Sequence, residues 1–339
     1  MIKQESTDNM LFKNGLGHGV FLAPMAGVTD HTYRTICKHF GTEFLVTEMI
    51  SSKGVYFQDK KTARLARIEK GEMPAGVQIF GHEPEIMAHA AQKLVALDYN
   101  GCVSEVAPDF VDNNMGCPVH KIVSSGDGSA LMKDPDLIYR IVKAVSAAVD
   151  VPVSVKIRAG WDKNSINAVE CALAAQEGGA ELITVHARTR EQMYTDFYDW
   201  SVIADVKKRV NVPVIGNGSI CSAKDVVKIK EQTGCDGVMI GRACQGNPFI
   251  FREIKEVLEN KPITPKTNEE IARVAALHLE MICEEKGETI GILEMRKHLA
   301  WYSHGMRGSP TFRNKCNLAE GFDEMKELIK WLADPKEES

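Results

Sequence analysis

Eight short apolar runs alternate with longer stretches of helical periodicity, and this alternation restricts the fold more than any other feature of the chain. The runs cover residues 20–23, 44–47, 76–79, 110–113, 153–157, 182–185, 214–216 and 237–240. Alternating strands and helices are typical of parallel βα units, and eight such units favour a closed (β/α)8 TIM barrel. An open doubly wound sheet is the alternative, although no Gly-x-Gly-x-x-Gly motif follows any of the runs.

The pattern changes after residue 260. Pro262 and Pro265 mark a linker, and Thr267 begins a capping motif that predicts a helix through about residue 286. Further helical periodicity covers residues 289–304 and 317–332. We therefore predict an α/β fold with two domains: a catalytic barrel over residues 1–260 and a small all-α domain over residues 261–339.

The cysteines and the hydropathy pattern indicate a reduced, cytoplasmic setting. The nine cysteines form no paired spacing that would suggest disulfides or, together with histidine, a metal site. Residues 1–14 lack the apolar core of a signal peptide, and no apolar run is long enough to span a membrane. We expect no metal and no membrane association, and nothing in the sequence implies an obligate protein partner.

Polar and glycine residues recur where the predicted strands end. Barrel enzymes build their active sites from the loops at the carboxyl ends of the strands, so these residues are the candidates for a site. They are Pro24, Met25 and Ala26 after the first run, Gln78 in the third, Asn114 and Cys117 after the fourth, Lys156 in the fifth, His186 and Arg188 after the sixth, Asn217, Gly218 and Ser219 after the seventh, and Gly241 and Arg242 after the eighth.

Two glycine turns follow the seventh and eighth runs, where barrels commonly bind phosphate through backbone N–H groups. These turns are Gly216-Asn217-Gly218-Ser219 and Gly241-Arg242, and Arg242 adds a cation. Each could be an ordinary tight turn. Their joint position favours a phosphorylated ligand.

Lys156 lies in an apolar run, and a buried lysine needs an anionic or electron-rich partner. A flavin ring, which gains negative charge on reduction, is one such partner, and a Schiff-base substrate is the other. Gln78 and Asn114 could give amide hydrogen bonds to a heterocycle.

Cys117 stands in the turn Asn114-Met-Gly-Cys-Pro118 directly after a predicted strand. The thiol could be a nucleophile or an acid. Its ordinary pKa of about 8.5 keeps it protonated at neutral pH, so it can donate a proton without being activated. His186 could act as its base or contact a ligand.

The charge of the chain gives no general indication of nucleic-acid binding, because the net charge is −5. Two local clusters do. The first is in the predicted barrel and contains Lys53, Lys60, Lys61, Arg64, Arg67 and Lys70, and the second is in the predicted helical domain and contains Arg296, Lys297, Arg307, Arg313 and Lys315. Clusters of this kind are more often simply solvated.

Taken together, these motifs resemble those of the tRNA-dihydrouridine synthases, and most of all their bacterial B-type branch. The segments that carry the resemblance are 22–30 (Leu-Ala-Pro-Met-Ala-Gly-Val-Thr-Asp), 114–118, 128–131, 155–158, 160–162, 186–190, 216–218, 241–243, 246–248 and, in the helical region, 295–302. Two positions depart from the common pattern: Ser219 replaces an acid, and Ala187 replaces a glycine.

The resemblance implies an FMN-dependent reduction of the 5,6-double bond of uridine in tRNA, with NADPH as reductant and Cys117 as proton donor. The implied flavin contacts are Pro24, Met25, Ala26, Gln78, Asn114, Lys156, His186, Asn217, Gly218, Ser219, Gly241 and Arg242. Arg188, Arg296, Lys297 and Arg313 would contact RNA.

Three other interpretations stay open at the level of sequence. The same chemistry could act on ribosomal RNA, or the barrel could reduce a small-molecule pyrimidine. The chain could also be an RNA-binding factor without turnover, against which the presence of Cys117 and Lys156 speaks. The sequence names no particular uridine.

Overall fold

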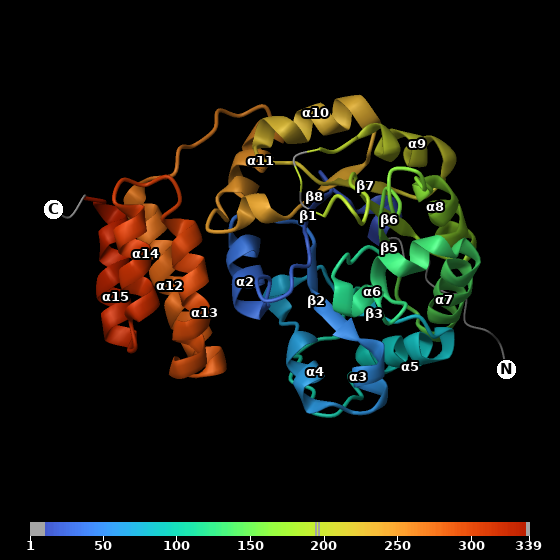
Figure 1. Ribbon diagram of the computed structural model, residues 1–339, viewed down its shortest axis with the longest axis horizontal. Coiled ribbons are helices and arrows are strands. Elements are labelled where there is room, and N and C mark those ends of the chain that lie inside the picture. Colours follow the sequence, from blue (N-terminus) through green and yellow to red (C-terminus); the bar gives the residue numbers. More distant parts are fainter. Residues whose placement is uncertain (1–10, 194, 196, 337–339) are drawn as a thin grey trace. The chain divides into compact units, whose positions relative to one another are not determined.

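Eight parallel strands form a barrel in the computed structural model, which describes residues 11–193, 195 and 197–336 (Figure 1). The strands are β1 (Val20–Leu22), β2 (Leu45–Ser51), β3 (Ala75–Phe80), β4 (Phe110–Asn114), β5 (Val153–Arg158), β6 (Leu182–His186), β7 (Val214–Asn217) and β8 (Gly237–Ile240). Strands β1 and β8 pair in parallel, and the Phe44 N–H, just before β2, donates to the carbonyl of Val20 at 3.1 Å. The barrel therefore closes, which confirms the predicted fold class.

Helix α1 (Leu11–Asn14) precedes the first strand, and the other helices of the barrel connect successive strands. These are α3 (Ser52–Tyr56), α4 (Lys60–Leu65), α5 (Pro84–Val95), α6 (His120–Val123), α7 (Pro135–Ala148), α8 (Ala168–Glu177), α9 (Ser201–Arg209) and α10 (Ala223–Thr233), with 3-10 turns η1 (Lys70–Glu72) and η2 (Gly128–Lys133). Helix α7 shows why they form: Asp134 caps its first turn by accepting from the Leu137 N–H at 3.0 Å. Its buried residues Ile138, Ile141, Val142 and Val145 follow one helical face.

Aromatic side chains fill the barrel near the amino-terminal ends of the strands. Phe110, the first residue of β4, contacts Phe12 of α1 with ring centroids 5.2 Å apart, and Phe21 stacks on Phe44 at 4.4 Å. Gly76 makes room for the Phe110 ring, because a Cβ atom there would lie 2.3 Å from it. The apolar filling at this end leaves the polar side chains to the carboxyl ends.

The chain divides into two compact units. The first contains the barrel, up to His31 and from Thr42 to Gly241, and the second contains Thr32–Gly41 and Arg242–Ser339. Most of helix α2 (His31–His39) therefore belongs with the carboxyl-terminal unit. A domain boundary after residue 260 stays a prediction.

The second unit is helical. It contains η3 (Arg242–Cys244), α11 (Ile250–Leu258), α12 (Asn268–Lys286), α13 (Glu288–Tyr302), α14 (Ser309–Leu318), α15 (Phe322–Lys330) and η4 (Trp331–Ala333). Thr267 caps α12 as predicted, accepting from the Glu270 N–H at 3.2 Å. The expectation of one helix over residues 317–332 is wrong, because the chain is extended at Gly321 (φ −126°, ψ 159°) and α14 ends at Leu318.

A buried aromatic cluster lies inside this unit. Tyr33 of α2 donates its hydroxyl hydrogen to the Cys244 carbonyl and packs against His278 and His298, with ring centroids 5.3 and 5.4 Å away. Burial lowers the pKa of His298, with the nearby His278 and Lys297 acting in the same direction. The cluster ties α2 to α12 and α13.

No helix among the described residues has the length and apolar character needed to cross a membrane. Residues 1–10, on which the expectation of no signal peptide partly rests, lie outside the described residues.

Candidate active site at the carboxyl ends of the strands

The backbone of Cys117 is held in place from both sides. The Asn114 side-chain oxygen accepts from the N–H groups of Gly116 and Cys117, at 3.2 and 2.9 Å. The Cys117 carbonyl accepts from the backbone N–H and the hydroxyl of Ser129, at 3.0 and 2.9 Å. Arg158 adds a bond from Nε to the Gly116 carbonyl at 2.8 Å. The turn therefore presents a half-buried thiol in one orientation.

Burial raises the pKa of the Cys117 thiol above its ordinary value. The Val119 backbone N–H and the positive charges of Arg158 and Lys156 oppose this effect without reversing it. A thiol of raised pKa is protonated at neutral pH, as a proton donor requires, whereas a nucleophilic cysteine needs a lowered one. The electrostatics therefore favour an acid over a nucleophile.

The segment that closes over Cys117 is anchored to a neighbouring loop. Gly128 has a positive φ of 59°, and a Cβ atom there would lie 2.8 Å from the Cys117 carbonyl oxygen. Asp127, next to it, binds the His82 ring nitrogen Nδ1 at 2.7 Å. His82 follows β3, so the loops after β3 and β4 hold each other.

Lys156 lies where β5 and β7 end. Its Nζ donates to the Asn217 side-chain oxygen at 3.1 Å, and the Asn217 amide donates in turn to the Met239 carbonyl at 2.7 Å. Burial, together with the charge of Arg158, lowers the pKa of Lys156 to about 8. An amine with this pKa still carries a charge at neutral pH and gains from an anionic partner.

The ends of β6 and β7 adjoin. Gly218 has φ of 104°, and a Cβ atom at this position would lie 3.2 Å from the His186 ring. His186 Nδ1 accepts from the Arg188 N–H at 3.3 Å, so in the neutral ring Nε2 carries the proton. Arg188 is 2% exposed, and its Nη2 donates to the Ser219 hydroxyl at 2.5 Å.

Pro24, Met25 and Ala26 form the turn after β1, in which Ala26 is exposed. Gly241 lies beside this turn, because a Cβ atom built on it would be 3.7 Å from Ala23 Cβ and 3.9 Å from Met25 Sδ. The two strands that close the barrel therefore bring their loops to one place.

The cofactor residues that were predicted within the barrel unit therefore lie at its strand ends. They come from every strand except β2. Among the RNA candidates, Arg188 is buried near Ser219 rather than placed on the surface. The others, and Arg242, belong to the helical unit. There Arg296 donates to the Ala319 carbonyl at 2.8 Å, and Lys297 Nζ lies 4.0 Å from Glu294 Oε2. Arg313 is half-buried.

Sequence reasoning missed Asp112 and the His82–Asp127 pair. Arg158 and Ser129 stand in the segments that carry the resemblance, but no role was predicted for them. Asp112 carried a signal in the sequence, because it is an acid directly after the apolar residues Phe110 and Val111 of a predicted strand, and the structure buries it to 2% exposure. The pairing of His82 with Asp127 joins residues 45 positions apart and has no local signal.

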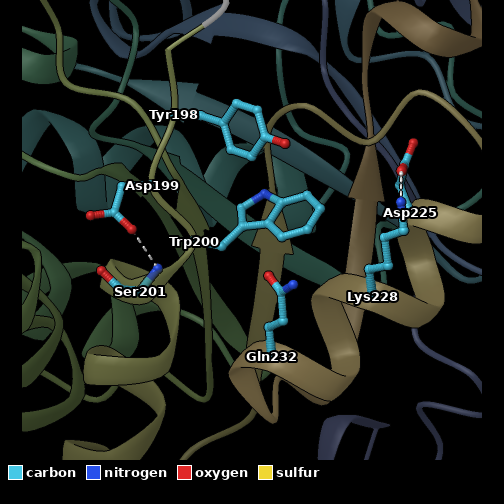
Figure 2. Close-up of a pocket in the computed structure, with 7 residues that line it drawn as sticks. All are labelled: Tyr198, Asp199, Trp200, Ser201, Asp225, Lys228 and Gln232. Atoms are coloured by element: carbon cyan, nitrogen blue, oxygen red, sulfur yellow. Dashed lines mark hydrogen bonds and ion pairs between the residues drawn. The ribbon is translucent and has the colours of Figure 1, made fainter.

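A cavity of about 670 Å³ opens elsewhere, between the segment before α9 and helix α10. Figure 2 shows Tyr198 and Trp200 facing Lys228 and Gln232 of α10. Trp200 donates from its indole N–H to the Gly218 carbonyl at 2.9 Å. The cavity is lined by none of the predicted cofactor residues.

Fold and site together define a (β/α)8-barrel enzyme whose strand ends combine a protonated thiol, a lysine of lowered pKa and glycine turns. The described residues hold no group of three or more His, Cys, Asp or Glu side chains arranged for a metal ion. The family model described as dihydrouridine synthase matches residues 21–336, and the chain belongs to that family.

Relatives match over most of their length. The chain is 39% identical over 305 residues to tRNA-dihydrouridine synthase B of Pseudomonas syringae, covering 89% of this chain and 88% of that protein. It is 39% identical over 313 residues to probable tRNA-dihydrouridine synthase 1 of Synechocystis, covering 91% and 85%. It is 40% identical over 284 residues to a probable tRNA-dihydrouridine synthase of Rhizobium leguminosarum, covering 84% of each. These findings confirm the resemblance seen in the sequence.

Proposed function

We propose that the chain is a flavin-dependent tRNA-dihydrouridine synthase that reduces the 5,6-double bond of uridine. Family membership and the names of the relatives support the reaction and its tRNA substrate. The observation that carries the proposal is the protonated Cys117 thiol, held in a rigid turn in the same barrel unit as Lys156 and the glycine turns.

The residues at the strand ends fit FMN. Gly218 has φ of 104° and a Cβ atom there would lie 3.2 Å from the His186 ring, so glycine would let a phosphate approach the backbone of this turn closely. Lys156 would face the electron-rich edge of the ring, and Pro24, Met25 and Ala26 would line one side of it. Gln78, Asn114, Asn217, Ser219 and Gly241 complete the proposed contacts from the barrel unit, and a contact from Arg242, the first residue of the helical unit, stays a prediction from the resemblance. Bound FMN, reduced by NADPH, would supply hydride to uracil C6.

Cys117 completes the reduction in this proposal. Its S–H bond breaks, the proton forms the new C–H bond at uracil C5, and the electron pair stays on sulfur as a thiolate. Solvent then returns the proton. A base that undergoes this chemistry must leave the RNA stack, which requires a second surface to hold the RNA backbone. We assign that surface to the helical unit.

Lys297 and Arg313 supply the basic groups of this surface, so the double variant Lys297→Ala/Arg313→Ala is expected to bind tRNA more weakly. Each phosphate that is no longer neutralised by a basic side chain reduces the slope of log K against log salt by about 1. Binding titrations at several salt concentrations measure the slope. Arg296→Ala is kept separate because Arg296 also bonds to the Ala319 carbonyl at 2.8 Å, and its loss would disturb the unit itself. An unchanged slope in the double variant removes the RNA role from these two residues.

Position-resolved mapping of dihydrouridine tests the proposed function. RNA is taken from cells lacking the gene and from cells resupplied with the wild-type or the Cys117→Ala protein. Loss of dihydrouridine at a defined tRNA position, restored only by the wild type, is the expected result. Loss of dihydrouridine from ribosomal RNA instead would identify ribosomal RNA as the substrate. No loss in either RNA would favour a small-molecule pyrimidine as the substrate.

A further inference from the structure

A buried chain of hydrogen bonds runs across three strands to the Cys117 turn. Ser154 of β5 donates its hydroxyl to Asp112 Oδ1 at 2.6 Å, and Gln78 of β3 donates from Nε2 to Asp112 Oδ2 at 2.6 Å. The Gln78 oxygen accepts from Asn114 Nδ2 at 2.8 Å. The Asn114 oxygen then accepts from the Gly116 and Cys117 N–H groups.

Strand register brings these side chains together on one face of the sheet. Gln78 pairs with Asp112, and Asp112 pairs with Ser154, on adjacent parallel strands. Asp112 and Asn114 are two residues apart on β4, so they point to the same face. The chain is therefore a consequence of register rather than of sequence neighbours.

The direction of every bond in this chain is fixed at its Cys117 end. At the Cys117 end, two backbone N–H groups can only donate, so Asn114 must turn its oxygen toward them and its nitrogen toward Gln78. Gln78 then presents its oxygen to Asn114 and its nitrogen to residue 112. A carboxyl oxygen of Asp112 accepts from this nitrogen and so completes the chain.

A carboxyl group buried at this position lowers the stability of the fold, so its presence indicates a role. Burial raises the pKa of Asp112, against the opposing effects of the bonds from Gln78 and Ser154 and the charge of Lys156. Burying a charge is unfavourable when neutral groups of the same shape would fit. Neither the proposed hydride transfer nor the proposed proton transfer uses Asp112 directly.

We propose that Asp112 is a positioning residue that accepts at the far end of the Gln78–Asn114 amide chain, in the direction that the Gly116 and Cys117 N–H groups require, and thereby holds the Cys117 turn. This inference rests on the proposed function only for the role of Cys117. The positions of Gln78 and Asn114 toward the cofactor follow from the same anchor.

The test exchanges the two ends of the Asp112–Gln78 bond in the full-length protein. In Gln78→Glu, two carboxylates face each other and the chain loses its donor. In the double variant Gln78→Glu/Asp112→Asn, the amide of residue 112 donates to the new carboxylate, which still accepts from Asn114. Ser154→Ala is the matched control, because it removes a bond to Asp112 but leaves the direction of the chain unchanged.

Two readouts follow the turn without substrate: hydrogen–deuterium exchange of the peptide that contains Cys117, and the rate of Cys117 alkylation resolved by peptide mass spectrometry. Loss of a buried hydrogen bond is expected to raise both by about tenfold in Gln78→Glu. The double variant is expected to return both to within about threefold of wild type, and Ser154→Ala to stay there.

The proposal is overturned if the double variant shows the same exchange and alkylation rates as Gln78→Glu. It is also overturned if Gln78→Glu itself shows wild-type exchange. If Gln78→Glu alone cannot be purified folded, Asp112→Leu takes its place, because leucine cannot accept from Gln78 Nε2, whereas the oxygen of an asparagine still could. It is expected to loosen the turn and, in steady-state kinetics, to lower kcat with little change in KM. Wild-type exchange and kcat in that variant overturn the proposal too. Because the readouts need no uridine, failure here is distinct from failure of the proposed function.

Discussion

Cys117→Ala is expected to lower the turnover of uridine by a factor of about 10² to 10⁴, the usual contribution of a positioned general acid. The backbone of residue 117 is held by Asn114 and Ser129 through main-chain groups, so the alanine variant keeps the turn. Flavin content and tRNA affinity are therefore expected to stay at wild-type levels. Single-turnover assays with reduced enzyme, together with tRNA binding titrations, separate these quantities.

The exposed cysteine Cys221 provides the matched control, and Cys221→Ala is expected to turn over normally. The pH dependence has a defined sign. Because burial raises the pKa of the Cys117 thiol, the acid is present below that pKa and is lost as pH rises through it. A wild-type rate in Cys117→Ala would remove Cys117 from the reaction.

The second large effect is expected for Lys156→Met, which removes the charged donor while keeping a side chain of similar length. Loss of one charged donor at a developing negative charge lowers kcat by about 10²- to 10³-fold. Weaker flavin binding and a more negative flavin reduction potential are expected at the same time. Flavin titration and potentiometry measure these, and Lys156→Arg, which keeps the charge, is the control.

Lys156 also gives flavin affinity a pH dependence. Its pKa is lowered to about 8 in the protein without ligand, so the charge is present below that pH and is lost above it. Flavin affinity is therefore expected to fall as pH rises through 8, and this fall is expected to disappear in Lys156→Met. The same pH profile in wild type and variant would contradict the assigned role of Lys156.

Local pattern was enough to predict the barrel and most of its strand ends. The run 110–113 is apolar at its start, and the structure extends it by one residue to Asn114. Lys156 and Asn217 could each be predicted as strand-end residues, because a parallel barrel places all carboxyl ends on one side. Their mutual bond at 3.1 Å required the structure.

Features that depend on the register between strands, or on a single break between two helices, were not predictable from the sequence. The link between Gln78 and Asp112 arises because these residues pair across β3 and β4, which no local pattern encodes. The last helix was predicted to begin at residue 317, whereas α14 ends at Leu318 and the backbone is extended at Gly321 before α15 begins. The burial of Arg188 likewise follows from its bond to Ser219, a residue of another loop.

The membership of α2 in the helical unit has a consequence for how the chain is made and how it can be divided. Tyr33 leaves the ribosome long before Cys244, His278 and His298, the partners that enclose it. Until those residues are synthesised, an aromatic face near the amino terminus has no cover within its own unit. Cutting the gene after the barrel would leave that face exposed for good. An exchange of helical units between two relatives would need to carry two separate pieces of coding sequence, Thr32–Gly41 and everything from Arg242 onward.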